Sequence, residues 1–286
     1  MSKTEDAAHL FEEIKESILK LDPVWFAENY LTLDGEPFRL TASGFKPFAD
    51  IYRYSGIKAL EPDAKPVGLV ASRQVGKTTM ATALEMYFTG SGLFGFNKAP
   101  MRIIHAFPTL VLATPYAKTK LNTMIQTSVI KVDKNNKKAK ETKPFMKDAL
   151  DMSSPSNDAQ FFKQFKGGSH IWVESMGLTG DRLRGRTADC IFFDEVQDML
   201  EGAISNSVRI LNQAKYGKPG QGIQTFFGTP KKKGSTFHKM WNMSNQQYYH
   251  LGCEQCKGFF QLHTPDSEDW EQIWLHDFIV KCPDCG

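Results

Sequence analysis

The segment from Ala71 to Thr79 constrains the fold of this chain more than any other feature. It reads Ala-Ser-Arg-Gln-Val-Gly-Lys-Thr-Thr and matches the phosphate-loop pattern G-x-x-x-x-G-K-[ST], except that Ala71 replaces the first glycine. In such a loop the backbone N–H groups surround a phosphate, Lys77 reaches the β and γ phosphates, and the Thr78 hydroxyl ligates Mg²⁺. A chance Gly-Lys-Thr turn is the alternative, but an apolar strand pattern before the segment and a helical pattern after it favour the loop. The expected ATP-binding residues are Ser72, Arg73, Gln74, Val75, Gly76, Lys77, Thr78 and Thr79.

A second motif supplies the acidic groups that a phosphate loop requires. The apolar run Cys190–Phe193 predicts a buried strand, and Asp194 and Glu195 follow it directly. An Asp at such a strand end holds Mg²⁺, usually through water, and the next carboxylate polarises the water that attacks the γ phosphate. Acidic residues are common where strands reach solvent, so this pair alone does not indicate a functional site. The phosphate loop upstream makes it the expected acidic partner. We expect Asp194 in the magnesium shell and Glu195, with Lys77, in catalysis.

The order of apolar segments predicts an α/β fold. From residue 67 onward, short apolar runs alternate with helical patterns, which is typical of a parallel sheet. Strands are expected at 67–71, 110–114, 169–175, 190–193 and 224–227, and helices at 4–21, 47–54, 78–88 and 116–130. With the two motifs, this order predicts a P-loop NTPase of the RecA/ASCE-like type, with a mainly parallel central sheet flanked by helices. We expect three regions: a helical lead-in or lid subdomain (1–60), the P-loop ATPase core (61–245) and a small cysteine module (246–286).

Four of the five cysteines form two Cys-x-x-Cys pairs near the end of the sequence, Cys253 with Cys256 and Cys282 with Cys285. Two such pairs form tight turns that present four thiolates tetrahedrally to Zn²⁺. Four unrelated thiols are the alternative, and in a reducing compartment the spacing favours metal binding over disulfides. We expect a closed, structural zinc site in a zinc-ribbon-like module. The fifth cysteine, Cys190, is expected to be a buried apolar strand residue.

Composition restricts the partners only weakly. The 286 residues are 41% hydrophobic and carry a net charge of +3, so a DNA-binding surface must come from local basic clusters. One cluster comprises Lys131, Lys134, Lys137, Lys138, Lys140, Lys143 and Lys147, in a segment (131–158) that we expect to be flexible and solvent-facing, and the other comprises Lys231 to Lys233. Each cluster is either a solvated loop or a sequence-independent DNA contact. With no long apolar stretch and a polar, acidic start, the sequence predicts a cytosolic protein without membrane contact.

Several motifs together resemble the N-terminal ATPase domain of phage terminase large subunits, over about residues 24 to 243. The segment Ser72–Thr79, with an arginine shortly after the strand, looks like the family's phosphate loop. The segment Leu183–Asp198 is similar to its Arg-Gly element and acidic strand. Phe227-Gly-Thr-Pro230, followed by Gly234 and residues 237–241, looks like its coupling motif, and Val111–Pro115 resembles a second-strand motif shared with helicases. The combination is specific, whereas no single piece is.

This resemblance implies an ATP-hydrolysing motor that moves double-stranded DNA into a viral procapsid, using ATP and Mg²⁺. It implies that Arg73 senses or stabilises the γ phosphate and that Thr229 couples hydrolysis to movement of the domain. It also implies a ring of subunits on a portal, a small terminase subunit as partner, and the host cytoplasm as location. In such rings a neighbour's arginine can complete the site. Arg184 and Arg186 are candidates, and the alternative is that both are loop arginines that pair with acids or contact DNA.

The sequence departs from the family in two places. The family reads adenine with a glutamine after a proline-aromatic pair, whereas Ala49 follows Phe48 here. The family also carries a C-terminal nuclease with a cluster of metal-binding acids, so nuclease activity is not expected from this sequence. Two other functions stay open. A helicase-like DNA translocase or repair ATPase needs a second motor lobe, and the Asp194-Glu195 pair argues against a non-hydrolysing ATP-binding adaptor.

Overall fold

The computed structural model describes residues 21–40, 48–90, 100–129, 144–248, 250–261, 282, 284 and 285. By its internal contacts the chain divides into two compact units, residues 1–241 and 242–286. The predicted helix at 4–21, except for its last residue, and the lysines from Lys131 to Lys143 lie outside the described residues. Among the described residues, no helix is long and apolar enough to cross a membrane.

A seven-stranded sheet forms the centre of the first unit, in the order β3-β9-β8-β4-β7-β6-β5. The five parallel strands are β3 (Val67–Val70), β9 (Ile223–Gly228), β8 (Cys190–Phe193), β4 (Arg102–Phe107) and β7 (His170–Ser175). Two short antiparallel strands, β6 (Phe162–Gln164) and β5 (Asp158–Ala159), extend one edge. The predicted strands at 67–71, 169–175, 190–193 and 224–227 are confirmed to within one residue at each end, as is the mainly parallel sheet.

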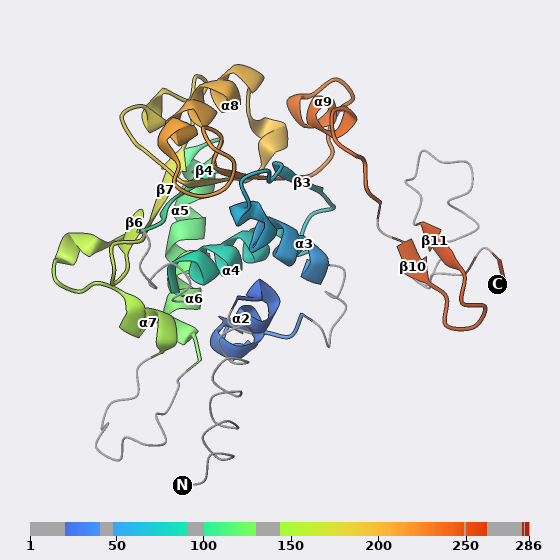
Figure 1. The fold of residues 1–286 in the computed structure, drawn as a ribbon, viewed down its shortest axis with the longest axis horizontal. Helices are drawn as coiled ribbons and strands as arrows, with labels where there is room; N and C mark the ends of the chain where they lie inside the picture. Colours follow the sequence, from blue (N-terminus) through green and yellow to red (C-terminus); the bar gives the residue numbers. More distant parts are fainter. Residues whose placement is uncertain are drawn as a thin grey trace, which may run out of the picture. The chain divides into compact units, whose positions relative to one another are not determined.

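Helices cover both faces of the sheet, and its central parallel strands β9, β8 and β4 are buried on both sides. Helix α4 (Lys77–Gly90) packs against one face and α8 (Glu201–Val208) against the other (Figure 1). Along β4, Ile103 belongs to the hydrophobic cluster on the α4 side and Ile104 to the cluster on the α8 side. Because alternate residues of a strand share a face, His105 points to the α4 side.

Two N-terminal helices pack against α4 and join the same hydrophobic cluster. Helix α2 (Pro23–Tyr30) begins with a proline, and Asp22 caps it by accepting a hydrogen bond from the backbone N–H of Val24. Arg53, on α3 (Phe48–Ser55), donates to the carboxylate of Asp22 at 3.0 Å and so connects the two helices. The predicted helix at 47–54 is confirmed from Phe48 onward.

The predicted strand at 110–114 is wrong. These residues begin α5 (Leu110–Pro115), which continues through a π-helical segment (Tyr116–Leu121) into α6 (Asn122–Thr127). The side chain of Val111 is 80% exposed, so this apolar run belongs to a solvent-facing helical turn. The strand lies earlier, at β4, where His105 interrupts the apolar run and weakens the strand pattern. The segment that resembles a second-strand motif therefore lies on a helix.

The expectation of a flexible, solvent-facing segment at 131–158 is wrong for residues 144–150, which include buried side chains. Helix α7 (Phe145–Ala149) forms within it. Met146 is fully buried, and the ring of Phe145 lies 4.4 Å from that of Tyr30. These two large apolar side chains anchor the segment to the core although lysines dominate its composition. Lys147 is exposed on the same helix.

The other elements are short. They are β1 (Thr32–Leu33), β2 (Glu36–Pro37), η1 (Lys58–Leu60), η3 (Pro155–Asn157), η4 (Asp181–Leu183), η5 (Val196–Asp198), η6 (Arg209–Gln213) and α9 (Thr236–Asn242). In the second unit, β10 (His250–Gly252) and β11 (Phe259–Gln261) form an antiparallel pair.

Candidate nucleotide site

The predicted phosphate loop joins β3 to α4. Ala71 donates its backbone N–H to the carbonyl of Gly228, at the end of β9, at 3.2 Å. Gln74 and Gly76 have positive φ angles of 62° and 89°, which turn the chain sharply before α4 begins at Lys77. Ala71 is not among the residues with positive φ, so the loop accepts alanine in place of the first glycine. The N-terminus of α4 then points its backbone N–H groups towards the loop.

Lys77 places its ammonium group inside this loop. Its Nζ donates to the carbonyls of Ala71 and Ser72 at 3.0 and 2.5 Å, and to Oγ1 of Thr229 at 3.2 Å. The residue is only 6% exposed. Burial lowers its pKa, while the nearby acid pair opposes that shift. A partly desolvated cation in the centre of a loop of N–H groups is suited to bind phosphate.

Thr78 and Asp194 meet between the start of α4 and the end of β8. Thr78 Oγ1 donates to Oδ2 of Asp194 at 2.7 Å, and Oδ1 accepts the backbone N–H of Glu195 at 2.9 Å. Asp194 is 1% exposed. Burial raises the pKa of this carboxyl, but His105 and the hydrogen bonds outweigh burial and hold the pKa below its usual range. An ionised carboxylate beside a hydroxyl oxygen is the type of donor set that Mg²⁺ binds, so the pair fits this ion.

A polar network lies on the core side of Asp194. His105 Nδ1 lies 2.6 Å from Oε1 of Glu85, and its Nε2 lies 3.6 Å from Oδ2 of Asp194. Tyr116 donates its hydroxyl to Oε2 of Glu85 at 2.6 Å and accepts from Thr82 at 3.3 Å. His105 and Glu85 are fully buried. Burial lowers the pKa of His105, but the two carboxylates outweigh burial and raise the pKa to about 9.

Glu195 adopts a left-handed conformation with φ at 57°, where β8 gives way to η5. Its carboxylate accepts a hydrogen bond from the amide of Gln197. Oε1 of Gln197 accepts the backbone N–H of Thr229 at 2.9 Å, and Thr229 Oγ1 accepts from Lys77. One glutamine therefore joins the expected catalytic carboxylate to the expected coupling residue.

Arg73 and Arg184 are both exposed but lie in different surroundings. Arg73 is part of the phosphate loop, close enough to Lys77 for its charge to lower the pKa of the lysine. Arg184 is 74% exposed and forms an ion pair with Asp181 at 2.7 Å. Such an exposed pair contributes little to stability, so Arg184 can exchange its partner readily.

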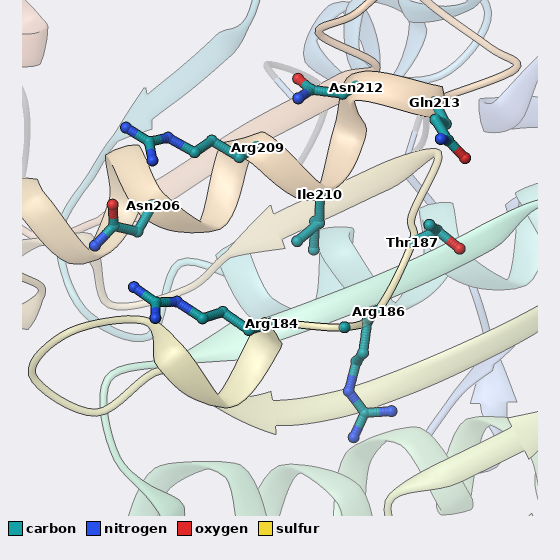
Figure 2. A pocket seen from close by; sticks show the side chains of 9 residues that line it. Arg184, Arg186, Thr187, Asn206, Arg209, Ile210, Asn212 and Gln213 are labelled. Carbon is teal, nitrogen blue, oxygen red and sulfur yellow. The ribbon is translucent and has the colours of Figure 1, made fainter.

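Arg186 is bound within its own subunit. Its guanidinium pairs with Glu174 and lies 3.8 Å above the ring of Trp172. These contacts favour the interpretation of Arg186 as a structural loop arginine. Figure 2 shows its side chain directed away from those of Arg184 and Arg209.

Arg184 lines a surface pocket of about 410 Å³ between the 184–187 segment and the end of α8 with η6. Asn206 and Arg209 line the same pocket, and no acidic residue does. Figure 2 shows the side chains of Arg184, Asn206 and Arg209 directed to the same side. The pocket is therefore basic and polar.

In the second unit four thiols come together. The Sγ atoms of Cys253, Cys256, Cys282 and Cys285 all lie within 4.8 Å of one another. The Sγ atoms of Cys253 and Cys285, and those of Cys256 and Cys282, are 3.6 Å apart. Tetrahedral zinc with Zn–S bonds of about 2.3 Å places its sulfurs about 3.8 Å apart, so the four thiols fit Zn²⁺. Cys190 is buried in β8, as expected.

Sequence reasoning missed Gln197, His105, Glu85 and Tyr116. The signal for Gln197 was its position two residues after Glu195, and the signal for His105 was a lone imidazole in an apolar strand. Ala49 is buried at 6% exposure and offers no side-chain hydrogen bond to adenine.

The parallel sheet, the loop at the end of β3 and the buried Thr78–Asp194 pair define a P-loop NTPase. Comparison of the sequence with known families then identifies the family within this class of protein. Residues 58–286 match the model of the family described as phage terminase large subunit gpA, ATPase domain, and the chain belongs to this family. The resemblance to terminases is thereby confirmed, and ATPase activity is supported. No curated protein matches the sequence.

Solved structures of phage large terminases are similar to this one. The HK97 bacteriophage large terminase aligns with a TM-score of 0.53 and 13% identity, over 78% of this chain and 40% of that chain. The Thermus phage P74-26 large terminase ATPase domain aligns with a TM-score of 0.40 and 14% identity, over 68% of this chain and 71% of that chain. The large terminase from the thermophilic bacteriophage D6E aligns with a TM-score of 0.39 and 17% identity, over 62% of this chain and 36% of that chain. At this identity the HK97 likeness shows the fold alone, and the chain spans 40% of that protein's length.

Proposed function

We propose that this chain is the ATP-hydrolysing motor of a phage terminase, which translocates double-stranded DNA into a procapsid. Membership of the gpA ATPase-domain family supports the role in packaging. The observation that carries the motor assignment is the link from Glu195 through Gln197 to Thr229, because it connects hydrolysis to a second strand end. An ATP-binding adaptor that does not hydrolyse has no need of such a link.

In the proposed reaction the loop N–H groups and Lys77 hold the β and γ phosphates. Mg²⁺, when bound, neutralises charge on the phosphate oxygens. Thr78 and Asp194 would hold the ion in its coordination shell, and Asp194 is kept ionised by its hydrogen bonds and by His105. Glu195 orients and polarises the attacking water, and Arg73 stabilises the charge that develops on the γ phosphate. Arg73 therefore joins Lys77 and Glu195 as a catalytic residue.

Coupling follows from the same contacts. Lys77 donates to Thr229, the backbone N–H of Thr229 donates to Gln197, and Gln197 donates to Glu195, so a chain of hydrogen bonds joins the phosphate-binding lysine to the catalytic carboxylate. When phosphate competes for the ammonium group, the bond to Thr229 weakens and the segment after β9 is released. That segment carries Lys231 to Lys233, which are exposed and able to contact the DNA backbone.

The proposed machine has further parts. Arg184 is the candidate that completes a neighbour's site in a ring on the portal, because Arg186 is committed to Glu174 and Trp172. The small terminase subunit is the second partner, and the host cytoplasm is the location. We retain the division into a lead-in (1–60), an ATPase core (61–245) and a module (246–286) whose four cysteines hold structural zinc.

Hydrolysis measured on the whole chain tests this function. We expect phosphate release that requires Mg²⁺ and is lost in Lys77→Ala, while Lys215→Ala, a matched exposed lysine, behaves as the wild type. The motor further requires that procapsids with portal and small subunit take up DNA only with an active chain. ATP binding without any hydrolysis under these conditions would identify an adaptor instead.

A further inference from the structure

His105 lies between two carboxylates in the core of the first unit. Its Nδ1 is 2.6 Å from Glu85, and its Nε2 is 3.6 Å from Asp194. Each ring nitrogen can present an N–H to one carboxylate. The imidazole therefore connects the proposed magnesium ligand to an acid on the buried face of α4.

On the Glu85 side of the imidazole, the contacts are fixed by the core. Thr78, Thr82 and Glu85 share one face of α4, because helical positions three and four apart lie above one another. Both oxygens of Glu85 are occupied, one by His105 and the other by the hydroxyl of Tyr116 at 2.6 Å. The His105 ring also stacks on Phe107, with centroids 4.6 Å apart and planes 1° from parallel. The direction of Nε2 is thus determined by the core.

On the Asp194 side of the imidazole, a hydrogen bond is missing. His105 Nε2 is one of three buried side-chain polar atoms without a hydrogen-bond partner in the described part of the chain. Its distance of 3.6 Å from Oδ2 of Asp194 is longer than a hydrogen bond. A buried donor that stops just short of a carboxylate is rare in folded proteins. A small rotation of the carboxylate would complete the bond.

We propose that His105 is a positioning residue for the magnesium site, whose Nε2–H bonds Asp194 as that carboxylate turns towards the metal shell. Glu85 and Tyr116 hold the imidazole in place for this contact. The inference rests on the proposed role of Asp194 and adds the residues that orient it. Groups that hydrogen-bond to metal ligands in this way typically change metal affinity or activity by 10–100-fold when they are removed.

Two substitutions separate the two ring nitrogens. The amide nitrogen of His105→Gln can take the place of Nε2 and donate to Asp194, whereas that of His105→Asn can replace only Nδ1 and donate to Glu85. For both variants we would measure the Mg²⁺ concentration that half-saturates ATP hydrolysis, and nucleotide affinity with the metal chelated. We expect His105→Asn to raise the half-saturating Mg²⁺ concentration about tenfold or more. Metal-free nucleotide affinity should stay as in the wild type, and His105→Gln should recover most of the loss.

A merely structural role gives a different pattern. Both variants would then lose stability and activity alike, at an unchanged Mg²⁺ requirement, and that result overturns the proposal. Asp194→Asn separates this failure from that of the proposed function. If Asp194→Asn raises the half-saturating Mg²⁺ concentration strongly and His105→Asn does not change it, only the positioning role of His105 is contradicted. If Asp194→Asn leaves that concentration unchanged, the positioning role of His105 and the proposed role of Asp194 are both contradicted.

A measurement on the unaltered chain covers variants that fail to fold. With ¹⁵N-labelled imidazoles, the Nε2–H resonance of His105 should shift when Mg²⁺ and a non-hydrolysable ATP analogue are added together. The analogue with chelator should leave it in place. If the Nε2–H resonance does not shift when Mg²⁺ and the analogue are added, the proposal is contradicted.

Discussion

The side-chain oxygen of Gln197 accepts the backbone N–H of Thr229 at 2.9 Å. The amide nitrogen of the same side chain donates to Glu195. Gly228 leaves room for this contact, since a Cβ at that position would lie 2.6 Å from Oε1 of Gln197. Two hydrogen bonds therefore join the carboxylate after β8 to the end of β9.

The first prediction follows from this link. Gln197→Ala removes both hydrogen bonds, and Glu195 loses the contact that orients it. We expect kcat for ATP hydrolysis to fall about tenfold, as the loss of roughly 1.4 kcal/mol would cause, with ATP affinity little changed. Gln221→Ala, a matched exposed glutamine, should behave as the wild type. Unaltered kcat in Gln197→Ala would show that the link has no part in hydrolysis.

The second prediction concerns the carboxylate itself. Glu195→Gln keeps the size of the side chain but removes the charge that polarises water. It should bind ATP normally and hydrolyse it slower by a factor on the order of 10² or more, measured by single-turnover phosphate release. Glu201→Gln, an exposed acid on α8, is the control. Wild-type turnover in Glu195→Gln would place the base elsewhere.

The contiguous motifs could be predicted from the sequence because their chemistry requires fixed neighbours. The phosphate loop and the Asp194-Glu195 pair each lie within a few residues, next to strands with unbroken apolar runs. Strand β4 could not be predicted in this way, because His105 interrupts its pattern while the exposed residues 110–112 imitate a strand. The sequence did not predict helix α7, in which Met146 is buried, because lysines dominate the composition of its surroundings.

Contacts between distant segments were beyond the sequence. Glu85 and His105 become neighbours only when α4 packs on β4, and Gln197 meets Thr229 only because β8 pairs with β9. For the arginines, spacing alone left Arg184 and Arg186 equivalent. The structure separates them through Trp172 and Glu174, which lie on β7.

The third prediction concerns zinc. The folded chain should carry about one Zn²⁺ by elemental analysis, because four sulfurs lie at distances that suit a closed tetrahedral site. Cys253→Ser should lose the metal and destabilise the second unit while ATP binding persists. Cys190→Ala should keep the metal, since that thiol is buried in β8. A metal-free chain whose second unit is fully stable would contradict the zinc site.

The fourth prediction separates Arg184 from Arg186. If Arg184 acts on a neighbour's nucleotide, the rate per subunit should rise with protein concentration, and Arg184→Ala should abolish that rise without changing the melting temperature. Arg186→Ala should lower the melting temperature instead, because it removes an ion pair and a cation–π contact. A rate that is independent of concentration, unaffected by Arg184→Ala and abolished in Arg73→Ala would place the arginine within the subunit.

The last prediction concerns DNA. Lys231 is paired with Asp198 at 2.5 Å, whereas Lys232 and Lys233 are exposed on the segment that follows Thr229. If these two lysines track the phosphate backbone, Lys232→Ala with Lys233→Ala should weaken duplex binding without altering ATP affinity. The slope of log affinity against log salt should become shallower by about 0.9 for each lost phosphate contact.

A matched pair of lysines tests whether position or only charge matters. Lys215→Ala with Lys218→Ala removes the same charge from the loop before β9, at the opposite end of that strand from Thr229. If the coupling segment binds DNA, this control should leave the salt slope unchanged, and sequence preference should stay absent in every variant because lysines on phosphates read no bases. Equal effects of the two pairs would indicate a general field effect. No effect of either would leave the ATPase site intact and move the DNA surface to another part of the protein, with the lysines at 131–143 as the next variants to compare.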